Sequence, residues 1–319
     1  MAGLFGGMFN YAKPGKGIDK NAPQKHRFLF FFELFFRKIW KLLGLNIIYF
    51  IITFPLVSFL AVYGFSAFIE HYGLDLSILG NDFLISLFLY FQTGLPRPIV
   101  LALVAVSAIL FGPLTAGMTY ILRNFVREEH AWLLSDLYQR TKENFKQGLL
   151  AGIIDILLVF SCILYMTVQI NQSMQYMGIL RYAALIVFCV YQIMRFYIYT
   201  IMVTFDMKFT SILKNAWLFF FLGIIKNIII IFFAGIVLYL TIAYFNIIFV
   251  PLLTYSLTGF IVVFNVYPTI KKYMIDPLTE RDEDSEIEIE YEDEDDEPIF
   301  EDDIVAKKRM ELEEAEKDK

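Results

Sequence analysis

The sequence predicts an all-α polytopic membrane protein with six transmembrane helices. Of its 319 residues, 58% are hydrophobic and 18% aromatic, and the mean hydropathy is +0.58. A soluble domain is closer to half apolar, so this chain has more apolar surface than one soluble core can bury. Because a helix needs about 20 apolar residues to cross a bilayer core, we expect spans at the apolar runs 45–69, 99–122, 149–169, 181–204, 223–244 and 247–266.

The positions of Lys and Arg predict how these spans are oriented, because basic residues near span ends resist translocation. Basic residues are frequent in segments 13–41 and 123–146, and they recur at 208–214 and 271–272. Segment 70–98 contains only Arg97, and segment 170–180 contains no Lys or Arg. We therefore expect a multi-pass protein of the cell (plasma) membrane with both termini in the cytoplasm.

The charge distribution divides the chain into two parts. From Asp276 onward there are 22 acidic and 6 basic residues, a net charge of −16, whereas the preceding part has 11 acidic and 21 basic residues, a net charge of +10. A segment such as 279–303 has too little apolar area to offset the entropy of ordering it. We expect a transmembrane domain over 1–275, with cytoplasmic amphipathic helices, and an acidic, largely disordered cytoplasmic tail over 276–319.

Three segments that lead into spans align without gaps: KIWKLLGLNII from Lys38, NFKQGLLAGII from Asn144 and NAWLFFFLGII from Asn215. Each precedes an outgoing and a returning span. This pattern predicts three helix-plus-hairpin repeats arranged around an axis along the membrane normal.

The stretch from Phe111 to Gln147 changes from apolar to charged. Its span contains Gly112, Pro113 and Gly117, and small residues in a membrane helix allow close packing. From Leu133 the spacing predicts an amphipathic helix with one apolar face (Leu134, Leu137, Tyr138, Thr141, Phe145) and one polar face (Asp136, Arg140, Glu143, Gln147). This helix would lie on the inner membrane surface or a partner, or else pack on the protein's own cytoplasmic ends.

The segment GPLTAGMTYILRNFVREEHAWLLSDLYQRTKENFKQG, together with NYAKPGKGIDKN, FFRKIWKLLGLN and SILKNAW, resembles the YesL-like family of bacterial membrane proteins, a domain-of-unknown-function family. The resemblance covers roughly residues 1–275. It implies a polytopic protein of a Gram-positive bacterium, encoded beside genes of carbohydrate uptake and utilisation, with no established activity. The long acidic tail departs from that family.

The sequence contains no motif of an enzyme. His26, His71 and His130 fall in three separate segments, and no zinc spacing, nucleotide-binding loop or nucleophile motif is present. We expect no catalytic residues, cofactor, metal or nucleic-acid partner. Cys162 and Cys189 fall inside predicted spans and are expected to be small apolar side chains.

Two charges inside predicted spans are candidates for a functional or structural pair. Counting 1.5 Å per residue, Asp155 lies about 10 Å and Arg195 about 14 Å from the cytoplasmic ends of their spans. Such charges normally face a partner or a water-filled cavity. Similar depths therefore predict an intramembrane Asp155–Arg195 pair.

Two functions follow from these patterns. The first is a non-enzymatic accessory or scaffold protein whose partners, besides the lipid bilayer, are permease subunits of a sugar importer; the partner-binding residues would be Arg123, Arg127, Asp136, Arg140 and Asn144. Competing structural roles are a helix cap at Asn144 and an Asp136–Arg140 ion pair. The second function is a small-solute transporter with Asp155 and Arg195 in its pathway.

Overall fold

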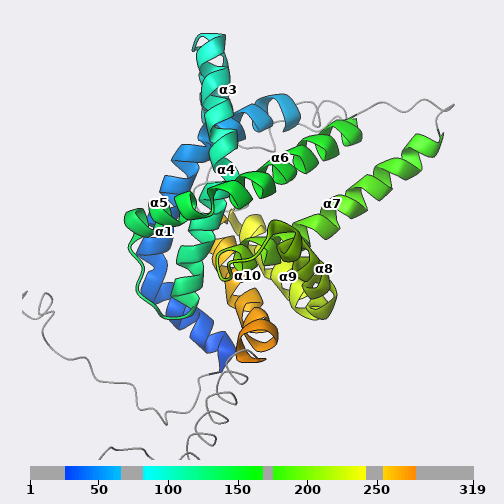
Figure 1. Cartoon of the computed structure of the whole chain (residues 1–319). Coiled ribbons are helices and arrows are strands. Elements are labelled where there is room, and N and C mark those ends of the chain that lie inside the picture. Colours follow the sequence, from blue (N-terminus) through cyan, green and yellow to red (C-terminus); the bar gives the residue numbers. More distant parts are fainter. Residues whose placement is uncertain (1–25, 66–81, 168–174, 242–253, 278–319) are drawn as a thin grey trace, which may run out of the picture.

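The computed structural model describes residues 26–65, 82–167, 175–241 and 254–277 (Figure 1). Within these ranges the regular structure is entirely helical, which confirms the all-α class. The α-helices are α1 (Arg27–Phe59), α3 (Asp82–Thr93), α4 (Arg97–Val126), α5 (Leu133–Glu143), α6 (Phe145–Thr167), α7 (Gln175–Met202), α8 (Phe209–Leu222), α9 (Ile224–Leu240) and α10 (Tyr255–Ile270). Two short π-helical segments, η1 (Leu60–Phe65) and η6 (Lys271–Ile275), continue α1 and α10.

In the described part of the chain, 4 helices are long and apolar enough to cross a membrane: Arg27–Phe59, Arg97–Val126, Phe145–Tyr165 and Tyr182–Met202. The pair α8 and α9 would add a fifth span, although the two helices meet at an angle of 87°. The predicted sixth span, 247–266, begins outside the described residues and ends within α10. The fold is therefore consistent with a multi-pass membrane protein, and the sixth span stays a prediction.

Two helical regions differ from the sequence-based expectation. Helix α1 begins at Arg27, well before the predicted span at 45–69, and it runs through the basic segment without a break. Helix α3 forms inside segment 70–98, where only a loop is expected. Most of its 12 residues are apolar, but a helix of that length is too short to cross a bilayer.

Helix α4 occupies the middle of the bundle and contacts α1, α5, α6, α7 and α10 (Figure 1). One apolar core joins α1, α4 and α10 through buried side chains that include Leu45, Phe125 and Phe260. A second core joins α7, α8 and α10 and includes Ile201 and Phe219. The two cores therefore meet along α10.

The contact between α4 and α6 depends on glycine. A Cβ atom on Gly112 would overlap the carbonyl oxygen of Gly148 and lie 2.7 Å from the backbone nitrogen of Gly152. A Cβ atom on Gly152 would lie 2.7 Å from the Cα atom of Gly112. The backbones meet directly, as the small residues predict.

Helix breaks occur at Asn144, between α5 and α6, and at Gly223, between α8 and α9. Their backbone angles are nearly the same, φ −92° and ψ 15° at Asn144 and φ −99° and ψ 15° at Gly223. Both breaks join a short helix to a longer one, whereas α1 is continuous. The sequence alignment, however, pairs Asn144 with Asn215 rather than Gly223. The threefold repeat therefore stays a prediction, and the breaks favour a different register.

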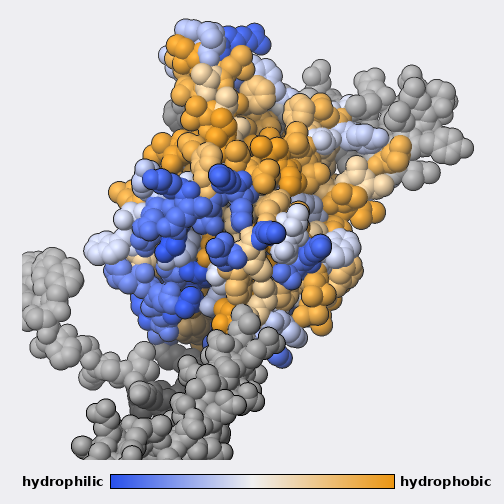
Figure 2. Space-filling view, viewed as in Figure 1, coloured by the Kyte–Doolittle hydropathy of each residue, from blue (hydrophilic) through white to orange (hydrophobic). Residues whose placement is uncertain are grey.

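The surface of the bundle is largely apolar around α3, α6 and α7, and polar around α5 (Figure 2). The exposed apolar side chains continue along α9 and include Ile225, Ile228 and Phe232. A protein in water rarely exposes so much continuous apolar surface. All 3 tryptophans of the chain, Trp40, Trp132 and Trp217, are also exposed, as is typical of aromatic residues at a membrane interface.

Candidate functional site

A cavity of about 340 Å³ lies between α1, α4, α6, α7, α9 and α10. Its volume is within the range of small-molecule binding sites, roughly 300–1,000 Å³. Polar side chains from several helices face it, including Tyr49, Thr115, Asp155, Gln192, Arg195 and Tyr199. Much of the remaining lining is aliphatic. The cavity is therefore an apolar chamber with a small polar region.

Asp155 of α6 is the centre of this polar region. Its side chain is buried, and its carboxylate accepts hydrogen bonds from Tyr191 Oη at 2.7 Å, Arg195 Nε at 2.7 Å and Tyr199 Oη at 2.8 Å. The donors are spaced by four residues on α7, so they lie on one face of that helix. The carboxylate is thus held by one charged and two neutral donors.

Arg195 connects this carboxylate to the cavity. Its Nε atom binds Asp155, and its guanidinium group lies 5.0 Å from the ring centroid of Tyr199 and 5.9 Å from that of Phe111. The side chain keeps 26% of its surface accessible, compared with 4% for Asp155. Since Arg195 lines the cavity, this accessible surface is available to a bound molecule.

A second polar contact joins α1 and α4 beside the cavity. Thr115 donates its hydroxyl hydrogen to the carbonyl oxygen of Phe111 at 2.7 Å. Tyr49 must then be the donor in the 2.8 Å hydrogen bond between its hydroxyl group and Thr115 Oγ1. Tyr49 is buried between Phe111 and Tyr255, whose ring centroids are 6.4 and 5.1 Å away. This contact fixes one wall of the cavity.

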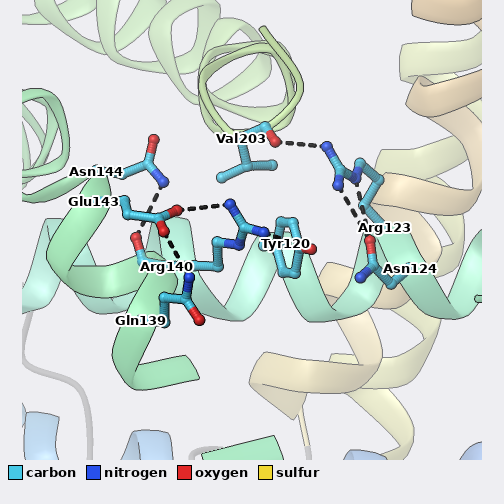
Figure 3. A network of polar contacts seen from close by, with 8 residues as sticks. All are labelled: Tyr120, Arg123, Asn124, Gln139, Arg140, Glu143, Asn144 and Val203. Carbon is cyan, nitrogen blue, oxygen red and sulfur yellow. Dashed lines mark hydrogen bonds and ion pairs between the residues drawn. The ribbon is translucent and has the colours of Figure 1, made fainter. Parts of the chain in front are cut away.

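The predicted partner-binding residues lie near the α4–α5 connection, where Figure 3 shows most of them. Arg123 is buried. It donates hydrogen bonds to the carbonyl oxygen of Val203 at 2.5 Å and to Asn124 Oδ1 at 3.2 Å (Figure 3). A carbonyl group at the end of a helix has no partner within that helix, so Arg123 satisfies one at the end of α7. Its guanidinium group connects two helices and is not displayed on the surface.

Arg140 contacts two groups of the same region. It donates to Glu143 Oε2 at 2.6 Å and to Tyr120 Oη at 3.1 Å (Figure 3). The expected Asp136–Arg140 pair is wrong, because the Asp136 carboxylate instead accepts the backbone N–H of Trp132 at 2.8 Å, at the start of α5. The hydrogen bond from Gln139 and the charge of Arg140 lower the pKa of the Glu143 carboxyl group.

Asn144 also has a role different from the one expected. Its Nδ2 atom donates to the carbonyl oxygen of Arg140 at 3.0 Å, so the side chain caps the end of α5 (Figure 3). The sequence favours a cap at the start of the following span, but the side chain turns back because the α5 carbonyl groups need a donor at the break. The Asn144 backbone carbonyl accepts the Gly148 N–H at 2.8 Å.

Arg127 remains near the surface, where it forms an ion pair with Glu129 at 2.6 Å.

The apolar face of helix α5 packs partly on the protein's own bundle and partly faces outward, so each of the two alternatives expected for it holds in part. Leu137 is buried and lies against Gly117 of α4, whereas Leu134 and Tyr138 are 69% and 73% exposed. The protein's own bundle therefore covers only one edge of the predicted apolar face.

The structure brings Asp155 and Arg195 together at 2.7 Å, and it adds residues that sequence reasoning missed. Sequence reasoning does not single out Tyr191, Tyr199 and Tyr49 as polar site residues, because the sequence around each of them is apolar. The available signal is the four-residue spacing of Tyr191, Arg195 and Tyr199 opposite an intramembrane acid. Within the described residues, no group of three His, Cys, Asp or Glu side chains is placed to hold a metal ion.

The fold is helical, its long apolar helices are consistent with a multi-pass membrane protein, and a polar site lies among these helices. Residues 42–168 match a family described as protein of unknown function, DUF624. The match extends from α1 to the end of α6, so it includes Asp155 but not Arg195. No curated protein and no solved structure matches the chain.

Proposed function

We propose that this protein binds a small solute in the cavity beside Asp155 and Arg195 and carries it across the cell membrane without changing it chemically. The observation that carries this proposal is the accessible guanidinium group of Arg195, which lines a cavity of about 340 Å³ while its Nε atom is held by buried Asp155. Charged residues at membrane depth commonly mark solute pathways.

The arrangement differs from a pair that serves packing alone. An ion pair that only joins two helices requires partners for its charges but no cavity of solute size beside them. Here the arginine lines a cavity together with Gln192 and Tyr255. Lining groups from six helices converge on one space, as in transporters that bind their solutes near the middle of the bilayer.

The test is solute-dependent protection of a cysteine placed in the cavity. In a chain with Cys162 and Cys189 replaced by Ala, Thr119→Cys would be labelled with a small hydrophilic thiol reagent in reconstituted membranes. A pool of dialysable metabolites should slow the labelling of Thr119→Cys and leave a matched Thr93→Cys variant, exposed at the end of α3, unaffected. Equal labelling rates with and without the pool would contradict solute binding.

The second candidate is the accessory or scaffold role. The observation that favours it is the exposed group Trp132, Leu134 and Tyr138 on α5, which the described part of the bundle leaves uncovered. With the YesL-like resemblance, this surface would contact permease subunits of a sugar importer and link the protein to carbohydrate utilisation. Leu134→Ser with Tyr138→Ser should abolish co-purification with such a permease, whereas Lys142→Gln, at another exposed position of α5, should not. Retention of the permease by the double variant would exclude this surface.

A further inference from the structure

We infer that the solute is a small carboxylate with an apolar body, bound through its carboxylate group by the terminal amino groups of Arg195. This inference rests on the proposed solute-binding function and names the class of solute. It follows from counting which hydrogen-bond donors around the cavity already have acceptors within the protein.

The threonine hydroxyl groups that line the cavity already have acceptors. Each donates its only hydrogen to the backbone carbonyl four residues earlier: Thr115 to Phe111 at 2.7 Å, Thr119 to Thr115 at 2.7 Å, Thr200 to Phe196 at 2.8 Å and Thr258 to Thr254. A hydroxyl group has one hydrogen and two lone pairs. These side chains can therefore accept a hydrogen bond from a solute, but they have no hydrogen left to donate.

The tyrosine hydroxyl groups at the polar end are mostly committed as well. Tyr199 and Tyr191 donate to Asp155, and Tyr49 donates to Thr115. Of the described side chains lining the cavity, Tyr255, Gln192 and Arg195 keep N–H or O–H groups for which the described residues supply no acceptor. Arg195 is the charged member of this group, and its Nη1 and Nη2 atoms lie side by side in one plane.

Asp155 contacts only one of the three nitrogen atoms of this guanidinium group. The carboxylate binds Arg195 through Nε only, and its charge is shared with two tyrosine hydroxyl groups. A guanidinium group presents paired N–H donors whose geometry matches the two oxygen atoms of a carboxylate. The free edge of Arg195 is therefore suited to a second carboxylate, supplied by the solute.

The remaining walls specify the rest of the solute. They are formed largely by aliphatic side chains, among them Leu56, Val57, Leu60, Ile156, Val159 and Val262. A polyhydroxylated solute would lose its hydrogen bonds to water along these walls, and aliphatic side chains offer no replacements for them. An apolar body fits these walls, with the carboxylate at the arginine end.

The test compares three probes on the full chain in lipid nanodiscs: hexanoate, its neutral amide hexanamide, and glucose. Hexanoate should raise the thermal unfolding temperature in a concentration-dependent manner and bind about ten-fold or more tightly than hexanamide, because hydrogen bonds to a charged group are the stronger ones. Glucose should have no effect. Equal or tighter binding of hexanamide or glucose would overturn the carboxylate assignment and leave solute binding itself supported.

Variants identify the site of binding. Arg195→Lys keeps the charge and loses the paired donors, so the affinity for hexanoate should fall. The double variant Asp155→Asn, Arg195→Gln leaves no unpaired buried charge, so it should fold and should lose the preference for hexanoate over hexanamide. Arg97→Gln, at an exposed arginine at the start of α4, is the matched control and should bind like the parent. A preference that survives in a folded double variant would overturn the role of Arg195.

The two experiments separate the two proposals. If none of the probes binds and Thr119→Cys is still protected by metabolites, the carboxylate class fails and the solute-binding function stands. Failure of both experiments rejects both proposals.

Discussion

Gly112 of α4 and Gly148 of α6 lie so close that a Cβ atom on Gly112 would overlap the Gly148 carbonyl oxygen. Since the atoms nearest to this position are backbone atoms, no side-chain rotation can make room. Any larger residue at Gly112 must move one helix away from the other.

We therefore expect Gly112→Ala and Gly152→Ala to lower the thermal stability of the purified protein severely, because the α4–α6 contact cannot form with a Cβ atom between the backbones. The matched control is Gly235→Ala in α9, where an added Cβ meets nothing within 4 Å. That variant should be as stable as the parent or more so, since alanine favours a helix by about 1 kcal/mol over glycine. Comparable melting temperatures for Gly112→Ala and Gly235→Ala would contradict the packing described.

A double-mutant cycle tests the Asp155–Arg195 pair. Asp155→Asn or Arg195→Gln alone leaves a charge without its partner and should cost about 3–5 kcal/mol. The double variant should recover much of that loss, and the interaction free energy obtained from unfolding in detergent measures the pair. Purely additive losses would show that the two charges do not stabilise each other.

Arg123 should contribute to stability rather than to partner binding. Arg123→Ala removes the donor to the Val203 carbonyl group and should destabilise the fold by about 1.5–3 kcal/mol, the range for hydrogen bonds to a charged group. Arg127→Ala, which removes an exposed ion pair with Glu129, should cost less than about 1 kcal/mol. Thermal unfolding of the two purified variants provides the comparison, and a stable Arg123→Ala protein would argue against the structural role.

The orientation predicted from the basic residues can be tested with two cysteines in a chain lacking Cys162 and Cys189. Thr93→Cys at the end of α3 should react with an impermeant maleimide in intact cells, whereas Ser135→Cys on α5 should react only after lysis. Both positions are exposed on the protein surface, so differences in labelling report the side of the membrane. The opposite pattern would place the basic side outside.

The sequence contains enough information for most of the long apolar helices and for the charged pair. Spans are predictable because hydropathy depends on local composition, and Asp155 and Arg195 can be paired because the helical rise converts residue number into depth. The contacts of Asp136, Arg140 and Asn144 could not be predicted, because each choice among nearby partners depends on the break at Asn144 and on how α5 meets α4. Spacing along a helix lists the possible partners without ranking them.

The cavity is the part that sequence reasoning could least anticipate. Its polar end uses tyrosines, which in an apolar sequence are as suited to a core as to a site. Its volume depends on side chains from six helices, and no local pattern encodes how such helices converge. Helix α3 was missed for a simpler reason, since its 12 residues are fewer than a membrane span requires.

The glycine contact between α4 and α6 also sets where α6 can move. With no side chain between the two backbones, the crossing is the point at which α6 is held most closely, and any tilt of α6 about this point would displace its atoms in proportion to their distance from Gly152. Asp155 is three residues from Gly152, about 4.5 Å along the helix axis, whereas Thr167, the last described residue of α6, lies about 22 Å away. A swing of α6 would therefore open the far end of the bundle widely while the Asp155 carboxylate stays almost stationary.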